Sequence, residues 1–293
     1  RGVPQLRMRL YFGAAIVLAA NCGGALTVIG DPTGLFLWNM GHVTPTAYSS
    51  AMALPCLTAW LLPTWWIGRS LPETTETEWV TMPYRGDDTR LNIRQRLLML
   101  FVGIGGLWFI PTFHRITKLS PFLGAFCVLA VLWVVNEIFN RRLIDTDEMM
   151  QRRVPRVLQY GVIQMMLYIM GIMLAVGVVQ ETGAVGWLVA QLDNYVGATW
   201  VAGTLAAALS TVLDSFTSAL TIFTIGKSNG LNSDYWSMIA YSTAVGGNIL
   251  CVGSLSGVAF LKTENARVGW YISNVGWKAF VGAALGLAVM IVM

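Results

Sequence analysis

The sequence has little charge. Only 12% of its 293 residues are charged and only two are histidine, whereas 55% are hydrophobic. A soluble domain normally carries about 25% charged residues, so this composition excludes a soluble globular domain, a disordered chain and a coiled coil. It also gives no reason to expect binding to nucleic acid. The composition is that of a membrane protein, whose first partner is the lipid bilayer.

The sequence also lacks a cysteine pattern. Its four cysteines each lie inside an apolar stretch, and no two share the spacing of metal ligands. A disulfide framework and a zinc site are therefore excluded, and we expect no cofactor. The formal net charge of +4 reports the orientation of a membrane protein rather than an acidic partner.

Long apolar runs divide the whole chain. A bilayer core of roughly 30 Å needs about 20 apolar residues per helix. Runs of this kind lie near residues 10–40, 43–67, 97–110, 122–139, 157–179, 200–225, 236–261 and 275–293. They predict an all-α polytopic membrane protein with a single transmembrane transport domain over residues 1–293. Because the first run begins soon after Arg1, we expect the sequence to be the C-terminal part of a longer chain, incomplete at its N-terminus.

Arginine is concentrated in two of the connections between these runs. Residues 68–96 and 140–156 each contain five arginines. Cytoplasmic loops of membrane proteins carry an excess of Lys and Arg, so both connections are predicted to be cytoplasmic.

The run at residues 200–225 is predicted to be a re-entrant hairpin. Its middle holds Asp214 among several Ser and Thr residues, which offer the backbone alternative hydrogen bonds. Lipid cannot satisfy a broken helix, so the segment has to be buried in protein. Each arm of about 12 residues, rising about 1.5 Å per residue, reaches only the middle of the membrane.

Two segments of the chain repeat each other at an offset of 223 residues. Residues 21–34 and 244–257 share glycines at the pairs 23/246, 24/247, 30/253 and 34/257, and Asp31 aligns with Ser254. The paired glycines weaken a helix, which predicts broken helices within residues 10–40 and 236–261. With the hairpin counted as re-entrant, the two copies run in opposite directions. Inverted repeats with broken helices are typical of secondary transporters, although close helix packing also uses small residues.

Two aspartates lie deep within apolar segments, Asp31 and Asp214. A charge at the bilayer centre costs a few kcal/mol, so each must be protonated, paired or coordinating. Removal from water favours the neutral form of a carboxyl group, which then holds either a proton or a cation. This competition is the basis of ion/proton antiport. Each Asp could also cap the N-terminus of a half-helix, a role that does not exclude coordination.

These segments resemble one known family. Four stretches of the sequence are similar, in matching order, to stretches of the NhaD-type sodium/proton antiporters. They are Asn21-Cys22-Gly23-Gly24 through Gly30-Asp31-Pro32-Thr33, residues 171–183, Leu209 to Asp214, and Gly246-Gly247 to Gly253-Ser254. The ion transporter superfamily to which they belong also holds arsenite and dicarboxylate carriers.

The resemblance implies two five-helix inverted repeats, each with a hairpin and a broken helix, and a homodimer. It assigns ion binding or transport to Asn21, Asp31, Thr33, Ser210, Asp214 and Ser254, with Asp31 and Asp214 as Na⁺ ligands. To these we add Asn248, beside the second Gly-Gly step, and Ser215, beside Asp214.

The chain departs from the family pattern at three points. Ser215 replaces an Asn, which removes an amide ligand, and Gly34 replaces the second Thr. The first hairpin is absent and is expected upstream of Arg1.

The sequence therefore predicts a multi-pass protein of the bacterial inner membrane that exchanges Na⁺ (or Li⁺) for H⁺ by alternating access. One alternative is an anion or oxyanion carrier of the same superfamily, with the anion at paired helix N-termini. The carboxylates favour a cation. A more remote alternative is an intramembrane aspartyl protease. That enzyme needs Gly-x-Gly-Asp, but Val28 occupies the first glycine position, and the Pro-Ala-Leu segment is missing. We expect no enzymatic activity.

Overall fold

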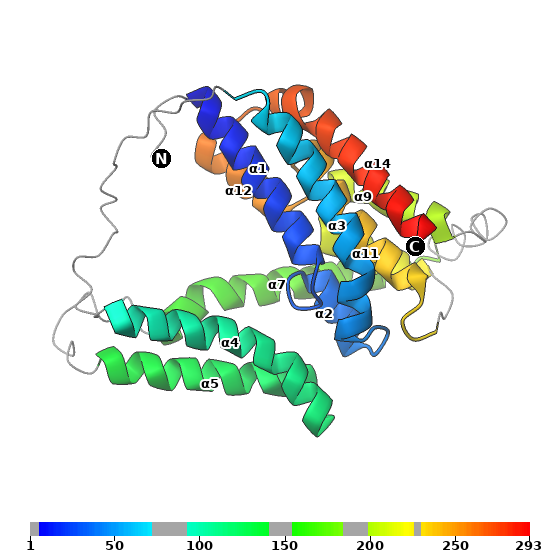
Figure 1. The fold of residues 1–293 in the computed structure, drawn as a ribbon. Helices are drawn as coiled ribbons and strands as arrows, with labels where there is room; N and C mark the ends of the chain where they lie inside the picture. The colour runs from blue at the N-terminus through cyan, green and yellow to red at the C-terminus, as the bar shows by residue number, and fades with distance from the viewer. Residues whose placement is uncertain (1–5, 72–92, 141–153, 184–198, 226–229) are drawn as a thin grey trace. The chain divides into compact units, whose positions relative to one another are not determined.

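The computed structural model describes residues 6–71, 93–140, 154–183, 199–225 and 230–293. Every regular element in these ranges is a helix (Figure 1). They are α1 (Leu6–Ala25), α2 (Pro32–Asn39), α3 (Pro45–Gly68), α4 (Ile93–Thr117), α5 (Pro121–Asn140), α7 (Val154–Glu181), α9 (Thr199–Val212), α10 (Ser215–Ile225), α11 (Asp234–Leu250), α12 (Leu255–Glu264), α13 (Val268–Tyr271), the π-helical turn η2 (Ile272–Gly276) and α14 (Trp277–Val292). Within these ranges, seven spans are long and apolar enough to cross a membrane. The prediction of an all-α polytopic membrane protein is confirmed.

The chain forms two compact units. One consists of residues 1–80 and 176–293, and the other of residues 81–175. The first unit contains both glycine-rich repeats and the segment at 200–225, so it holds all the candidate site residues.

Proline sets the start of several helices. Pro32, Pro45 and Pro121 each occupy the first helical position, where the missing N–H is not needed and the fixed φ suits a helix. Asp31 and Thr44 precede the first two prolines as N-cap residues in extended conformation. The chain therefore restarts a helix directly after Asp31.

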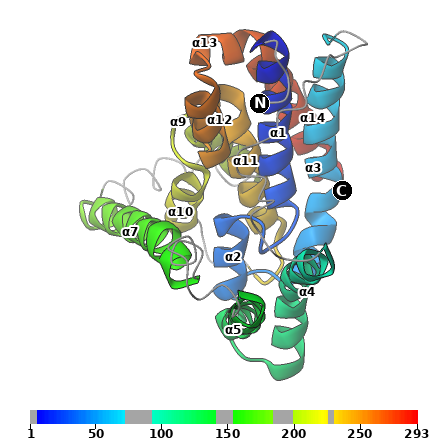
Figure 2. The same cartoon turned by 90° about the vertical axis from the view of Figure 1, so that its left-hand side faces the viewer.

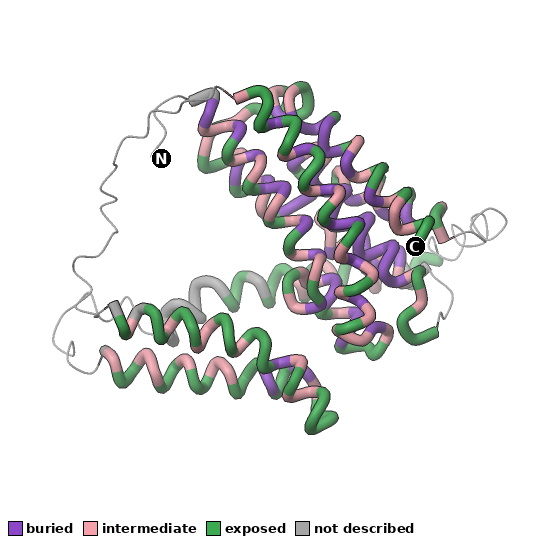
Figure 3. Tube along the Cα trace, in the orientation of Figure 1, coloured by how far each residue is buried: buried purple, intermediate pink, exposed green. Residues whose placement is uncertain are grey.

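In the first unit, α14 packs along α3, and α11 packs along α9 (Figures 1 and 2). Gly282 and Gly286 allow the first contact, because a Cβ on Gly286 would lie 2.7 Å from the carbonyl oxygen of Pro55. The second region has an apolar core of Ala206, Ala219, Ile222 and Ile239 from three helices. Buried residues concentrate on α1, α3 and α11 (Figure 3).

The two ends of the first unit differ in charge. The end where α1 begins and α3 finishes carries basic side chains, most of them exposed or partly buried, and an ion pair between Arg9 and Glu264 at 2.8 Å. The basic residues there are Arg9, Arg69, Lys262, Arg267 and Lys278. This bias supports a cytoplasmic position for that end. Most of the arginine-rich connections at 68–96 and 140–156 lie outside the described residues.

In the second unit, α4 and α5 form an antiparallel pair joined by three residues, Lys118 to Ser120. Its side chains are mainly apolar and exposed: Phe101 is 75% exposed and Trp108 80%. Such apolar faces are stable in contact with lipid or another protein surface but unfavourable in contact with water. The connection between the predicted apolar runs at 97–110 and 122–139 is shorter than expected, since α4 continues to Thr117. The hydroxyls of Thr112 and Thr117 donate hydrogen bonds to backbone carbonyls of the preceding turn.

The last apolar helix also begins earlier than predicted. Helical structure starts at Val268 rather than near Val275 and passes through η2 before α14. The polar side chains of Ser273 and Asn274 bond backbone carbonyls one turn earlier, at 2.6 and 2.8 Å. Polar residues that bond their own helix do not end it.

Candidate functional site

The two glycine-rich repeats have matching backbone geometry. Helix α1 ends at Ala25 and α2 begins at Pro32, while α11 ends at Leu250 and α12 begins at Leu255. The starts of α2 and α12 differ by the repeat offset of 223 residues. Each non-helical connection separates a longer first helix from a shorter second one.

Glycines at equivalent positions make equivalent close approaches. A Cβ on Gly24 would lie 3.1 Å from the carbonyl oxygen of Gly30, and one on Gly247 would lie 2.9 Å from that of Gly253. Both pairs are related by the same offset. In both repeats, the glycines therefore allow the chain to fold back closely against the end of the preceding helix. The opposite membrane direction of the two copies stays a prediction.

The capping residues of the two repeats behave differently. Ser254 accepts a hydrogen bond from the backbone N–H of Gly257 at 3.2 Å and so caps α12. Asp31 occupies the equivalent N-cap position of α2 with extended backbone angles, but its side chain makes no cap hydrogen bond. Its carboxylate interacts with the backbone N–H and hydroxyl of Thr33 and, electrostatically, with Asp214.

The segment at 200–225 consists of two helices separated by Leu213 and Asp214. The carboxylate of Asp214 accepts a hydrogen bond from the backbone N–H of Phe216 at 3.1 Å, so Asp214 caps α10. Helices of 14 and 11 residues are each too short to span a bilayer. Re-entry of this segment into the membrane stays a prediction.

Asp31 and Asp214 lie close enough to interact electrostatically, and we call them the acid pair. Their helices, α2 and α10, pack through aromatic rings. Phe36 contacts Phe216 edge to face, with ring centroids 6.1 Å apart, and stacks on Phe223 at 6.0 Å. Two acidic side chains that lie 183 residues apart in the sequence, at positions 31 and 214, thus share one region of the first unit.

Two buried hydroxyl groups belong to residues that follow the acid pair closely in the sequence, Thr33 and Ser218. The Thr33 hydroxyl interacts with the carboxylate of Asp31, whereas the Ser218 hydroxyl has no hydrogen-bond partner among the described residues. Thr33 follows Asp31 by two residues, and Ser218 donates its backbone N–H to the carbonyl oxygen of Asp214 at 3.0 Å. Tyr48, 1% exposed, also interacts electrostatically with Asp31. Buried polar atoms normally have partners, so these oxygens are candidates for ligands of a bound ion.

A second polar cluster joins the two repeats. Asn21 donates to the side-chain oxygen of Asn248 at 2.7 Å, and Ser256 donates to the side-chain oxygen of Asn21 at 2.6 Å. We call these three residues the amide bridge. Ser254 lies beside it, with its hydroxyl oxygen 3.4 Å from that of Ser256. The backbone of Asn248 accepts a further bond from Tyr271 at 3.0 Å.

The predicted site residues therefore separate into groups. Asp31, Thr33 and Asp214 lie together, and Ser215 is the first residue of α10, next to Asp214. Asn21, Asn248 and Ser254 gather around the amide bridge. The side chain of Ser210 joins neither group, because its hydroxyl donates to the backbone carbonyl of Thr243 and ties α9 to α11, although its backbone carbonyl lies against Gly253.

Sequence reasoning missed Tyr48, Ser218 and Ser256. Ser218 could have been found, since it lies four residues after Asp214 and therefore one helical turn away. Ser256 could have been found as the second serine after Gly253. Tyr48 gave no local signal, because it reaches the site from α3, whose sequence is otherwise apolar.

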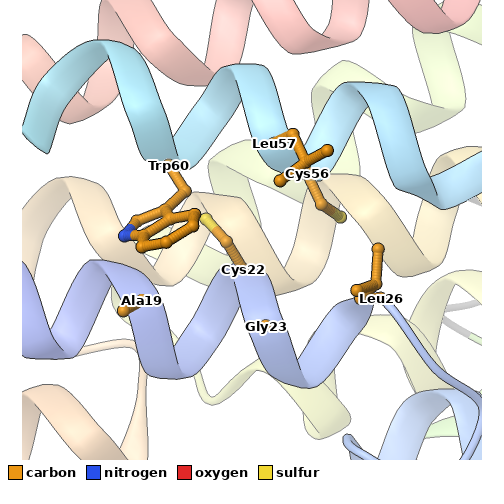
Figure 4. A pocket seen from close by; sticks show the side chains of 7 residues that line it. All are labelled: Ala19, Cys22, Gly23, Leu26, Cys56, Leu57 and Trp60. Carbon is orange, nitrogen blue, oxygen red and sulfur yellow. The ribbon is translucent and has the colours of Figure 1, made fainter.

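A pocket of about 190 Å³ lies between α1 and α3 (Figure 4). Its lining residues are Ala19, Cys22, Gly23, Leu26, Cys56, Leu57 and Trp60. The lining contains no carboxylate, so the pocket is not the place for a hard cation. Cys22 connects it to the amide bridge, since its sulfur accepts a bond from Asn248 at 3.6 Å. Within the described residues, no cluster of three or more His, Cys, Asp or Glu side chains could hold a metal.

Comparison with known proteins places the chain among transporters. A family model described as citrate transporter (CitMHS) matches residues 4–246. Sodium/proton antiporter 1 of Arabidopsis thaliana is 29% identical over 291 residues, which are 98% of this chain and 49% of that protein. Na(+)/H(+) antiporter NhaD of Vibrio cholerae is 25% identical over 300 residues, covering 95% of this chain and 60% of that protein. The protein of the same name from Vibrio parahaemolyticus is 24% identical over 298 residues, covering 93% and 67%.

The chain spans about half the length of the Arabidopsis protein, at 49%. No solved structure matches it significantly. The matches confirm the resemblance to NhaD-type antiporters, and they point to a transporter rather than an enzyme. With the family model matched over most of its length and seven apolar spans in its described residues, this multi-pass membrane protein belongs to the citrate transporter (CitMHS) family.

Proposed function

We propose that this protein exchanges Na⁺ (or Li⁺) for H⁺ across the membrane by alternating access, with the acid pair as the shared binding site. The observation that carries the proposal is the approach of Asp31 and Asp214 within a bundle of apolar helices. The names of the relatives from Vibrio and Arabidopsis support the same choice of ions.

The chemistry follows from the cost of placing two carboxylates together away from water. Both cannot remain ionised unless a cation lies between them, and otherwise at least one takes up a proton. Sodium binding and proton binding then exclude each other. A protein that exposes the acid pair first to one side and then to the other therefore exchanges the two ions.

Oxygen atoms are the ligands that hard cations prefer. We assign the hydroxyls of Thr33 and Ser218 to the coordination of Na⁺, together with the carboxylates of the acid pair. Both hydroxyls are buried; that of Thr33 lies at the carboxylate of Asp31, and that of Ser218 has no partner among the described residues. A bound ion would give the Ser218 oxygen the partner that a buried polar atom normally has.

The other predicted site residues receive supporting roles. The amide bridge holds the two repeats in register, so we place Asn21, Asn248 and Ser254 in the transport machinery through this connection. Ser215 borders the acid pair at the start of α10. Ser210 bonds α9 to α11 and so helps to set the position of Asp214, which follows the end of α9.

An anion carrier is the second candidate, because the family model is described as a citrate transporter. Helices α2 and α10 both begin at the acid pair, and helix N-termini attract anions. The two carboxylates at those N-termini oppose an anion and favour a cation. We also propose that the protein resides in a bacterial inner membrane and functions as a homodimer within a single transport domain.

Everted membrane vesicles of the full-length protein with a pH-sensitive dye test the proposal. We expect NaCl and LiCl, but not choline chloride, to dissipate a respiratory proton gradient. Tris citrate at constant sodium provides the comparison. A response to citrate without a response to sodium would contradict antiport and favour the anion carrier.

A further inference from the structure

Two basic side chains without acidic partners among the described residues, Arg69 and Lys278, lie at the end where α3 finishes and α14 begins, and Ser70, next to Arg69, bonds Lys278. Lys278 is only 8% exposed, and its ammonium donates one long hydrogen bond, 3.4 Å, to the hydroxyl of Ser70. An ammonium group has three donors. Lys278 therefore keeps unused hydrogen-bonding capacity beside the exposed Ser70.

Arg69 precedes Ser70 and also lacks an ion-pair partner in the part of the chain that the structure describes. Its guanidinium carbon lies 3.9 Å from the ring centroid of Trp65, a cation–π contact that fixes the group. Elsewhere at the same end, Arg9 is paired with Glu264 at 2.8 Å. Arg69 and Lys278 thus differ from Arg9 in having positive charge that no described carboxylate neutralises.

Exposed tryptophans surround these two cations. Trp65, Trp66 and Trp277 are 54%, 36% and 47% exposed, and the rings of the last two lie 5.0 Å apart. Tryptophan is enriched at the level of the lipid headgroups, where its ring is partly in apolar surroundings and its N–H reaches water. The aromatic rings therefore place the two cations at the depth of the lipid phosphates.

We propose that Arg69, Ser70 and Lys278 form a binding site for the phosphate group of an anionic phospholipid. A phosphodiester carries one negative charge and accepts hydrogen bonds from guanidinium and ammonium donors, which Arg69 and Lys278 supply. Ser70 holds Lys278 beside Arg69: its hydroxyl accepts from the ammonium and donates to the backbone carbonyl of Trp66 at 3.2 Å. Basic pockets between transmembrane helices on the cytoplasmic side bind anionic headgroups in this way. Trp66 and Trp277 contact the glycerol and the first methylene groups of the chains. Inorganic phosphate shares the charge but lacks the chains that these rings cover.

Native mass spectrometry of the full-length protein in neutral detergent tests the site by titration with phosphatidylglycerol and phosphatidylcholine. We expect tighter binding of phosphatidylglycerol. Because one basic residue near a membrane surface contributes about 1 kcal/mol, Arg69→Gln and Lys278→Gln should each weaken that binding about fivefold. Lys278→Arg should retain it, because the charge remains. The matched control is Lys262→Gln, an exposed cation at the same end on α12, which should leave the affinity unchanged.

Two results would overturn the proposal. The first is phosphatidylglycerol affinity that is unchanged in Arg69→Gln or falls equally in Lys262→Gln. Arg69 is exposed, so its substitution gives an answer even if Lys278→Gln fails to fold. The second is displacement of the lipid by millimolar inorganic phosphate, which would identify a site for a soluble anion. We expect inorganic phosphate not to compete.

Discussion

The two glycine-rich repeats share a backbone but differ in chemistry. In both, a close glycine contact folds the chain back before a second helix starts, at Pro32 and at Leu255. In the second repeat, Ser254 caps that helix with a well-aligned hydrogen bond, whereas in the first, the carboxylate of Asp31 makes no such bond and interacts with Thr33 and Asp214. The comparison teaches that the repeat supplies geometry, and that one changed residue turns a structural cap into a candidate ion ligand.

The largest effect should come from neutralising the acid pair. Asp31→Asn and Asp214→Asn keep the shape of the side chain and its ability to cap a helix, but they remove the group that binds Na⁺ or H⁺. We expect both variants of the full-length protein to reach the membrane at near-normal levels and to lose sodium-driven proton movement in everted vesicles.

Asp234→Asn is the matched control for these variants. Asp234 begins α11, is exposed, and belongs to the end of the first unit remote from the basic residues. Exchange should persist in this variant. Antiport in Asp214→Asn with an unchanged pH profile would show instead that the hairpin Asp is only a cap and that the ion binds elsewhere.

Substitution of the shared glycines tests whether the repeat geometry is required. A Cβ on Gly247 would meet the backbone of Gly253 at 2.9 Å, whereas one on Gly23 would meet nothing within 4 Å. We expect Gly247→Ala to reduce stability by about 1–3 kcal/mol through overcrowding, and Gly23→Ala to be tolerated. The midpoint of thermal unfolding in detergent measures the difference, and equal midpoints would contradict the observed chain reversal.

Removal of the two capping side chains should affect stability unequally. Ser254→Ala removes the bond from Gly257 and should cost about 1 kcal/mol, the usual value for an N-cap. Asp31→Ala removes no well-aligned cap hydrogen bond, only the weaker contact with Thr33, so it should lower the unfolding midpoint less than Ser254→Ala does while abolishing exchange. A large loss of stability in Asp31→Ala would mean that Asp31 acts chiefly as a cap.

The smallest effect is expected at Glu181. This residue is exposed at the C-terminal end of α7 and lies outside both repeats. Glu181→Gln should reduce exchange only slightly, if the acid pair carries the titration. Complete loss of sodium-driven proton movement in this variant would require a third carboxyl group in the mechanism.

Much of this arrangement could be predicted from the sequence because it depends on local signals. The paired glycines predicted an interruption within residues 10–40, where α1 ends and α2 begins, and the Ser/Thr-rich middle of residues 200–225 predicted the interruption at Asp214. Apolar length identified the membrane spans. Helix ends were predicted less well where polar residues such as Thr117 and Asn274 bond their own helix.

The completed site could not be predicted, because it depends on which helices pack together. Tyr48 lies on α3 and interacts electrostatically with Asp31, and Ser256 donates a hydrogen bond to Asn21, 235 residues away in the sequence. Ser210, in contrast, was expected at the ion site but bonds the backbone of α11. A single sequence specifies polar residues in apolar segments but not their partners.

Sodium binding to the purified full-length protein tests the central claim most directly. Protons released per bound ²²Na⁺ are measured in weakly buffered detergent solution for the wild type and for Asp31→Asn. We predict that the wild type releases protons on binding Na⁺ and that raising the proton concentration weakens sodium binding, whereas the variant does neither. Sodium binding without proton release in the wild type, or equal release in Asp31→Asn, would contradict the assignment of one shared site to Na⁺ and H⁺.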